Sequence, residues 1–138
     1  MLKKESYLKY MEVVVDLKNN ITKQKMEAKT SKVKMKNIAQ SARKLRLVAD
    51  LVRGKDVEKA LEILEFTNKK GALFVKKAIN SGVANAIEQH GVDKSALRVK
   101  EILVDEAPTF KRGRFAARGR YAVIFKRRSH INLELEVK

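Results

Sequence analysis

The chain has 138 residues and a formal net charge of +16 at pH 7, with 32 Lys or Arg against 16 Asp or Glu. This length suffices for one domain with a modest core, and a hydrophobic fraction of 44% favours a folded chain over a disordered one. The lack of cysteine excludes disulfides, thiolate metal sites and cysteine nucleophiles, and no apolar run approaches the length of a membrane span. The charge indicates a polyanionic partner or an anionic membrane surface.

The positive charge is concentrated in two segments. Residues 31–55 carry eight basic and one acidic side chain, and residues 107–138 carry nine and two, so each has a net charge of +7. Residues 56–106 carry eight and nine, a net charge of −1, and residues 1–30 carry seven and four, a net charge of +3. A one-signed excess of this kind favours a binding surface over a solvated face.

The first 30 residues show no strong period and are expected to form an extension of the domain. The apolar run in the opening "MLKKESYLKYMEVVVDL" is short and is broken by Glu12 and Asp16, which argues against a signal peptide. Residues 32–39, "KVKMKNIA", alternate partially between apolar and lysine positions. This pattern predicts an edge strand, because lysines commonly guard exposed strand edges.

Three helices are predicted next. The first spans about 41–53, is capped by Ser41 and ends before Gly54, and its apolar residues recur at helical spacing. Its opposite flank is basic, through Arg43, Lys44, Arg46 and Arg53.

The second helix, "VEKALEILEF", follows a cap at Asp56 and has an acidic outer face, so we expect it to lie away from any polyanion. The third begins at Thr67 or Asn68 and runs to about Gln89, with Gly91 as its stop. Its small residues, including Gly82, favour close packing against a neighbouring element.

From Leu97 the period becomes that of β-strands. Residues 97–110 alternate with a phase slip near Lys100 and Glu101, which predicts a bulge. "YAVIF" (121–125) is a second β run, and "HINLELEVK" (130–138) alternates strictly, as expected of a half-buried strand.

The order of three helices followed by three strands predicts an α+β fold, with three helices packed on a three-stranded antiparallel sheet. Residues 31–138 form a single domain in this interpretation, with a long protruding hairpin at about 105–128. We expect the hairpin to need a partner for its order, because its glycines and alanines cannot build a core.

The hairpin has the composition of a nucleic-acid-binding segment. Eight Lys or Arg and no acidic residue lie between Ala107 and Leu133. Arginine binds phosphate through two hydrogen bonds, and aromatic rings stack on unpaired bases. The candidate phosphate contacts are Lys111, Arg112, Arg114, Arg118, Arg120, Lys126, Arg127 and Arg128. Phe110, Phe115 and Tyr121 are candidate stacking residues, with packing within the hairpin as their alternative role.

No residue pattern indicates an enzyme, a metal site, a cofactor or a small-molecule substrate. His90 and His130 lack partners at metal-ligand spacing, and Asp105 and Glu106 are neighbours on a strand and so point to opposite faces. A membrane-bound segment would be an amphipathic helix, which the glycine-broken hairpin is not. The alternative function is a DNA-binding module with helix 41–53 in a major groove, although that helix needs its apolar face for the core.

Several blocks of the sequence, read in order, are similar to those of one family. These blocks are "SARKLRLVADLVRGK" (41–55), "ALEILEFTNKKGALFVKKAINSGVANA" (60–86), "VDEAPTFKR" (104–112), and "ARGR" with "HINLEL" (117–135). They resemble the large-subunit ribosomal protein twenty-two family of the bacterial type, over about residues 26–138.

The resemblance implies a structural constituent of the large ribosomal subunit in the cytoplasm. It implies binding to large-subunit (23S-type) rRNA, a part in subunit assembly, neighbouring ribosomal proteins as partners, and a hairpin that lines the peptide exit tunnel with the nascent peptide near its tip. It assigns rRNA contacts along the hairpin to Lys111, Arg112, Arg118 and Arg120. From the body it assigns such contacts to Arg43, Lys44, Arg46 and Arg53.

The chain departs from the family pattern at the hairpin tip and at its start. Ala116 stands where the family usually has Arg, Phe115 stands where it usually has Pro, and we expect Arg114 to supply the missing charge. The family commonly starts near "MEAK", which here begins at Met26. Two interpretations of residues 1–25 are therefore open: Met26 is the initiator, or these residues are a lineage-specific rRNA-binding tail.

Overall fold

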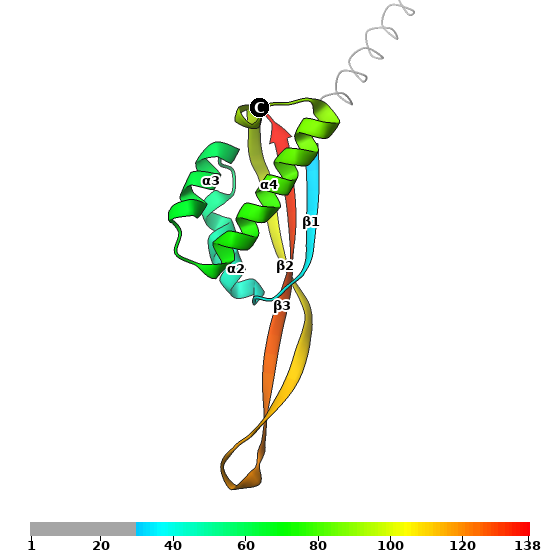
Figure 1. Cartoon of the computed structure of the whole chain (residues 1–138). Helices are drawn as coiled ribbons and strands as arrows, with labels where there is room; N and C mark the ends of the chain where they lie inside the picture. The colour runs from blue at the N-terminus through cyan, green and yellow to red at the C-terminus, as the bar shows by residue number, and fades with distance from the viewer. Residues whose placement is uncertain (1–29) are drawn as a thin grey trace, which may run out of the picture.

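A computed structural model describes residues 30–138 of the chain, so the expected extension and both interpretations of Met26 lie outside the described residues, apart from Thr30. The described part runs from a strand through three helices to two long strands (Figure 1). In chain order these are β1 (Thr30–Ile38), α2 (Ala42–Val52), α3 (Val57–Phe66), α4 (Lys70–His90), β2 (Leu97–Phe115) and β3 (Tyr121–Val137).

The three strands form one antiparallel sheet in the order β1-β3-β2, which confirms the α+β class and the edge strand predicted at 32–39. The predicted order of elements was wrong in one respect, because one of the three strands precedes the helices. The segments 121–125 and 130–138 belong to the single strand β3. Residues 126–128 break its apolar alternation with basic side chains, but Lys126 and Arg128 still pair with β2, since ladder hydrogen bonds do not require apolar side chains.

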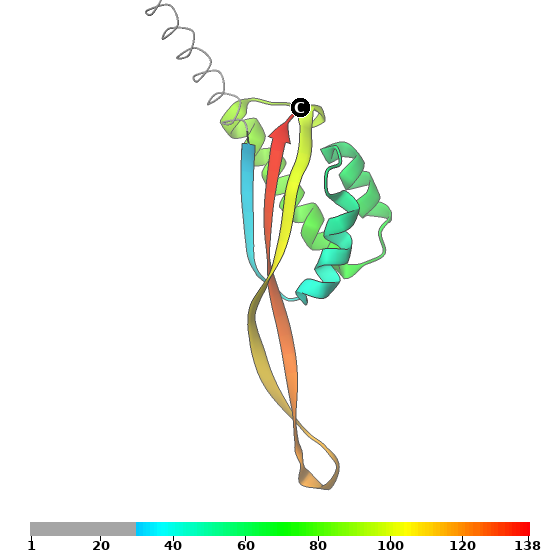
Figure 2. The ribbon, with the colours of Figure 1, turned by 180° about the vertical axis from the view of Figure 1, so that it is seen from behind.

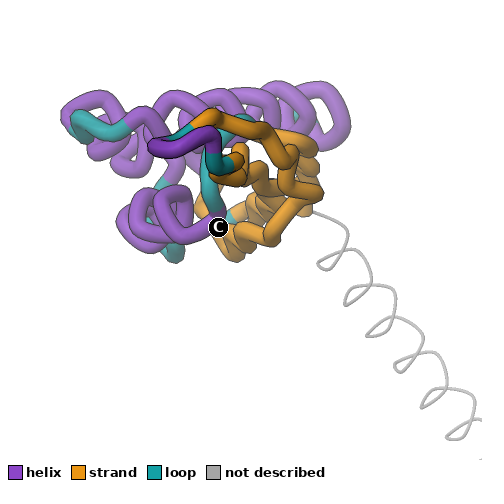
Figure 3. The backbone as a smooth tube through the Cα atoms, turned by 90° about the horizontal axis from the view of Figure 1, so that it is seen from below, coloured by secondary structure: helices purple, strands orange, loops and turns teal. Residues whose placement is uncertain are grey.

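The helices cover one face of the sheet and leave the other open. Figure 2 shows the open face with its strands in front, and the view from below in Figure 3 shows the helices grouped to one side of the strands. The apolar stripes predicted for the helices are buried against the sheet, and Leu45, Val52, Ile79 and Leu135 are fully inaccessible to solvent. Burying each such side chain contributes about 1.5–3 kcal/mol to folding.

Gly82 shows why α4 carries small residues. A Cβ placed there would lie 2.8 Å from Cδ1 of Leu135 on the central strand, which is too close for an unshifted structure. The hydroxyl of Ser31 on β1 donates a hydrogen bond to the Gly82 carbonyl at 3.0 Å. The predicted close approach therefore joins α4 to the two strands beneath it.

The helix ends agree in part with the sequence. Ser41 and Asp56 occupy N-cap positions as predicted, but neither forms a side-chain capping hydrogen bond. The third helix begins at Lys70 rather than at Thr67 or Asn68, because the Thr67 hydroxyl bonds back to the Ile63 carbonyl at 2.6 Å and closes α3 instead.

The hairpin continues the two strands of the core past two irregularities in their pairing. The pairing of β2 with β3 shifts between Val99 and Glu101, where the bulge was predicted, and again between Ala107 and Phe110. The second shift contains Pro108, which has no N–H to donate to a ladder. Beyond it the two strands remain paired as far as Phe115 and Tyr121, and Figure 1 shows this arm projecting away from the helices.

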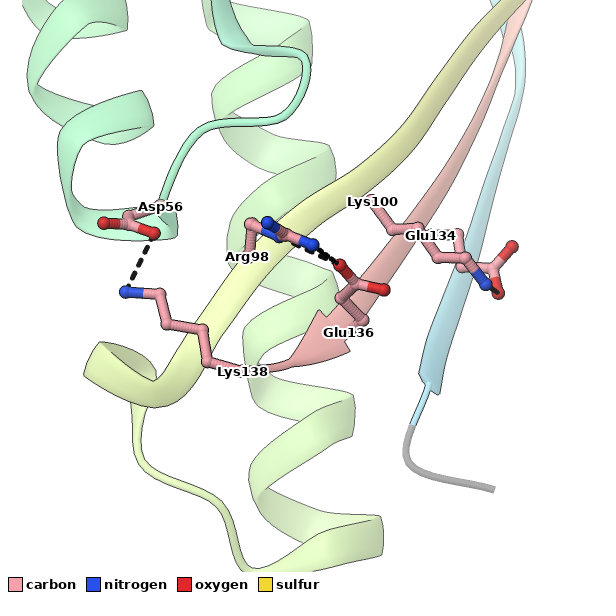
Figure 4. A network of polar contacts seen from close by, with 6 residues as sticks. All are labelled: Asp56, Arg98, Lys100, Glu134, Glu136 and Lys138. Carbon is pink, nitrogen blue, oxygen red and sulfur yellow. Dashed lines mark hydrogen bonds and ion pairs between the residues drawn. The ribbon is translucent and has the colours of Figure 1, made fainter. Parts of the chain in front are cut away.

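Ion pairs join the strands at the end of the sheet opposite the hairpin (Figure 4). Arg98 on β2 donates from Nε to Oε1 of Glu136 on β3 at 2.9 Å, and Lys100 donates to Oε1 of Glu134 at 3.2 Å. These opposite charges lie across neighbouring strands, an arrangement that stabilises a sheet by roughly 0.2–1 kcal/mol for each pair.

A further pair joins the last residue to the start of α3. Nζ of Lys138 lies 2.8 Å from Oδ1 of Asp56, and this hydrogen bond is the main reason that the pKa of Asp56 lies below its ordinary value. Desolvation opposes this effect, and the positive charges of Lys138, Lys59 and Arg98 act in the same direction as the hydrogen bond. The ionised carboxylate therefore stabilises the fold above its ordinary pKa, and the stabilisation is lost as pH falls through the lowered value.

We predict that Asp56→Asn lowers the melting temperature slightly at neutral pH. The difference in melting temperature between the variant and the native chain should disappear as pH falls below 3.8. Asparagine keeps a favourable N-cap residue, so the variant removes mainly the charge. Thermal unfolding followed by circular dichroism over this pH range measures the difference. Asp93→Asn is the control, and a gap for Asp56→Asn that does not change with pH would contradict the prediction.

Candidate nucleic-acid interface

The cations of the hairpin have no carboxylate partners in the described part of the chain. All seven ion pairs there join residues of the body, and none includes a Lys or Arg between 107 and 128. Every predicted phosphate-binding residue of the hairpin is exposed except Arg128, which is half-buried. These uncompensated charges repel one another, and an anionic ligand would remove that repulsion.

The three predicted stacking residues have different surroundings. Phe110 lies beside two guanidiniums, with Cζ of Arg128 4.5 Å and Cζ of Arg112 5.4 Å from the ring centroid. Phe115 and Tyr121 face each other across the two strands in an edge-to-face arrangement at 6.4 Å. All three rings thus take part in packing within the hairpin, while Phe115 remains 82% exposed.

Tyr121 also covers Gly113 on the opposite strand. A Cβ built at Gly113 would clash with the Tyr121 ring, so the absence of a side chain lets the ring lie flat against the backbone. An aromatic ring over a strand glycine supplies the packing that glycine lacks. The glycines and alanines of the hairpin were expected to offer little to bury, and this contact is a small packed cluster near the tip.

The tip is a short turn between the two strands. The Ala116 N–H donates to the Arg120 carbonyl at 2.7 Å, and residues Ala117–Gly119 form a tight turn between the strands. Arg118 and Gly119 have φ values of 59° and 67°, in the left-handed region. Phe115 and Ala116, where the chain departs from the family pattern, end the strand and begin the turn.

The four basic residues predicted on α2 divide into two pairs. Arg43 and Lys44 are exposed beside the base of the hairpin. Arg46 instead donates from Nε and Nη2 to the Val104 carbonyl at 3.1 and 3.0 Å, and Arg53 donates from Nη2 to the Ile102 carbonyl at 3.1 Å. These two guanidiniums attach α2 to β2.

A groove of about 930 Å³ lies where the base of the hairpin meets the helices. Its walls come from three separate segments: residues 39–48, residues 68–70 before and at the start of α4, and the hairpin. Seven Lys or Arg and no acidic residue line it, namely Lys44, Lys69, Lys70, Arg112, Lys126, Arg127 and Arg128. Phe110 and Phe125 also border it.

Sequence reasoning missed Lys69, Lys70 and Phe125 as members of this surface. The two lysines belong to a segment whose net charge is −1, so counting by segment concealed them. A signal was present, because adjacent lysines at the start of a helix oppose its dipole and are unfavourable there without an anionic partner.

The remaining polar residues named from the sequence have structural contacts. Nδ1 of His130 accepts a hydrogen bond from the Asn37 N–H at 2.9 Å, and Oδ2 of Asp105 accepts one from the Asn132 amide at 2.7 Å. In residues 30–138 no group of three or more His, Cys, Asp or Glu could hold a metal ion. No helix of that part is long and apolar enough to cross a membrane.

Comparison with known proteins identifies the family. The family profile described as ribosomal protein L22p/L17e matches residues 33–136. The chain belongs to the ribosomal protein L22p/L17e family. It is 54% identical over 96 residues to the large ribosomal subunit protein uL22 of Mycoplasmopsis agalactiae, a match that spans 70% of this chain and 84% of the relative. The family resemblance of the sequence blocks is thereby confirmed.

The L22p/L17e match includes the whole basic surface, since α2, the start of α4 and the hairpin all lie within residues 33–136. The groove and the arm are therefore parts of the family's domain.

We predict that Arg46→Gln lowers the free energy of unfolding by roughly 1–2 kcal/mol, because it removes two charge-assisted hydrogen bonds to the Val104 carbonyl. Lys44→Gln, a matched loss of charge on the same helix, should leave that energy unchanged within about 0.5 kcal/mol. Urea unfolding of both variants measures the difference. Equal stabilities of the two variants would show that Arg46 does not hold α2 to β2.

Proposed function

We propose that the chain is a structural protein of the large ribosomal subunit that binds large-subunit rRNA through its hairpin and the adjoining groove. Membership of the ribosomal protein L22p/L17e family supports the structural role and a place on the ribosome in the cytoplasm. The observation that carries the rRNA contact is the arm of paired strands, whose exposed cations have no carboxylate partner among residues 30–138. An arm of this kind can enter between RNA segments, where phosphates approach it from several sides.

The residue types favour RNA over other polyanions. Arginine forms two hydrogen bonds with a phosphate and also stacks on bases, and single-stranded RNA exposes bases that aromatic rings can contact. We assign phosphate contacts to Arg114, Arg118 and Arg120 near the tip and to Arg43 and Lys44 on the body. The other assigned contacts are Lys111, Arg112, Lys126, Arg127 and Arg128.

The length and narrow shape of the arm support a position for its tip deep inside the subunit. Beyond Ala107 the arm is only two strands wide, so it can reach into the subunit while the helices stay outside. We propose that it contributes to subunit assembly, lines part of the peptide exit tunnel, and brings Phe115 close to the nascent peptide. The exposed Phe66 at the end of α3 is suited to contact a neighbouring ribosomal protein.

The alternative of a DNA-binding module with α2 in a major groove has less support. Five residues of α2 are buried in the core, and Arg46 and Arg53 bond to carbonyls of β2. A recognition helix needs such side chains free to reach base edges.

We predict that the protein co-sediments with large ribosomal subunits and remains with them in high salt. Each exposed phosphate contact weakens as salt rises, but an arm enclosed by folded rRNA cannot leave without disrupting that RNA. Sedimentation at increasing salt with immunodetection measures retention. Complete extraction by salt, together with a preference for duplex DNA, would overturn the ribosomal assignment.

We predict that Arg118→Glu with Arg120→Glu sharply reduces incorporation into large subunits and leaves the melting temperature of the free protein unchanged. Both side chains are exposed at the tip, so the reversed charges repel RNA phosphates and do not disturb the buried core. Quantitative mass spectrometry of subunits from cells expressing tagged protein measures incorporation. The matched control is Lys77→Glu with Lys94→Glu on the body, and normal incorporation of the tip variant would refute the role of the hairpin.

A further inference from the structure

The groove at the base of the hairpin combines positive charge with exposed apolar surface. Its seven cations come from α2, the start of α4 and both strands of the arm, so they converge on one space from different directions. Leu47 on its wall is 68% exposed and Phe125 is 52% exposed. A phosphate chain alone would satisfy the cations and leave these apolar groups in water.

The two aromatic residues of the groove differ in how closely neighbouring guanidiniums approach their rings. Phe110 already lies close to Arg112 and Arg128, and these cation–π contacts hold both guanidiniums at the groove. Phe125 has one more distant guanidinium, with Cζ of Arg127 5.9 Å from its ring centroid. The Phe125 ring is therefore the stacking surface still available to a ligand.

The start of α4 adds a second source of positive potential. This helix of 21 residues begins at Lys70 without a side-chain capping hydrogen bond, and Lys69 and Lys70 both line the groove. The first N–H groups of a helix and its dipole favour a phosphate at that end. The groove therefore has an anion-binding wall at the start of α4 as well as the aromatic residue of the arm.

We propose that this groove holds an extruded, unpaired nucleotide of the RNA, with its base stacked on Phe125 and its phosphates on Lys69, Lys70 and Arg127. The inference rests on the proposed function, since it names what the rRNA places in the groove. A nucleotide has a flat apolar base and an anionic backbone, the same pair of properties that the groove presents. The volume lies in the range of pockets that bind small ligands and is too small for a duplex.

The first test is ultraviolet cross-linking of the full chain bound to full-length large-subunit rRNA. A base stacked on Phe125 should leave a nucleotide adduct on the tryptic peptide of residues 121–126, "YAVIFK", and mass spectrometry should place the adduct on Phe125. The cross-linked nucleotide is then replaced by an abasic residue in the rRNA. We expect this replacement to weaken binding about tenfold, a typical loss when one stacked base is removed.

The second test compares substitutions of Phe125. Phe125→Leu keeps an apolar side chain and removes the ring, and we expect about a tenfold loss of affinity, whereas Phe125→Tyr should bind normally. Phe66→Leu, at an exposed phenylalanine outside the groove, is the matched control and should bind normally. With the abasic rRNA, Phe125→Leu should cause no further loss, because both changes remove the same contact.

The outcomes separate this inference from the proposed function. If the native chain binds rRNA but Phe125→Leu has no effect and no adduct forms on residues 121–126, the groove holds only RNA backbone and the inference is wrong. If Phe125→Leu impairs only incorporation into subunits, a protein occupies the groove and the inference is also wrong. If the native chain does not bind rRNA, the proposed function itself fails.

Discussion

The antiparallel pairing of β2 with β3 is the constraint on which the rest of the structure depends. The same two strands form the floor of the core at one end, where Leu97 pairs with Val137, and the projecting arm at the other, where Phe115 pairs with Tyr121. Because the helices bury the first part of the ladder, they also fix the direction of the second part. Packing in the core thus determines the direction of the arm. Arg46 contributes by joining α2 to the part of β2 that precedes the arm.

Charge is divided between the two ends of this ladder. At the end remote from the arm, cations are matched by carboxylates, as in the pairs of Arg98 with Glu136 and Lys138 with Asp56. Along the arm the cations have no such partners within residues 30–138, although cation–π contacts with Phe110 hold two of them in place. The remote end of the sheet therefore pairs its cations with carboxylates, whereas the arm and groove present cations that an anionic ligand can balance.

The sequence predicted those features that depend on local periodicity. The helical stripes through Leu45 and Ile79 and the bulge near Glu101 follow from the spacing of apolar residues, and the exposed arm follows from a basic, glycine-containing segment between two β-like segments. It did not predict that β3 is continuous, because backbone pairing through the basic residues leaves no apolar signal. Nor could it predict the groove, since Lys69 and Phe125 are brought together only by the folded chain.

The arm combines paired strands with an unbalanced charge, and the two properties act together in binding. Its strands are paired from Phe110 to Phe115, and Tyr121 covers Gly113 on the opposite strand. A backbone paired in this way has less entropy to lose on binding than a disordered basic tail. The repulsion among the cations remains until phosphates neutralise it, so its relief adds to the affinity. Paired strands and unbalanced charge therefore both favour an RNA that is folded around the arm.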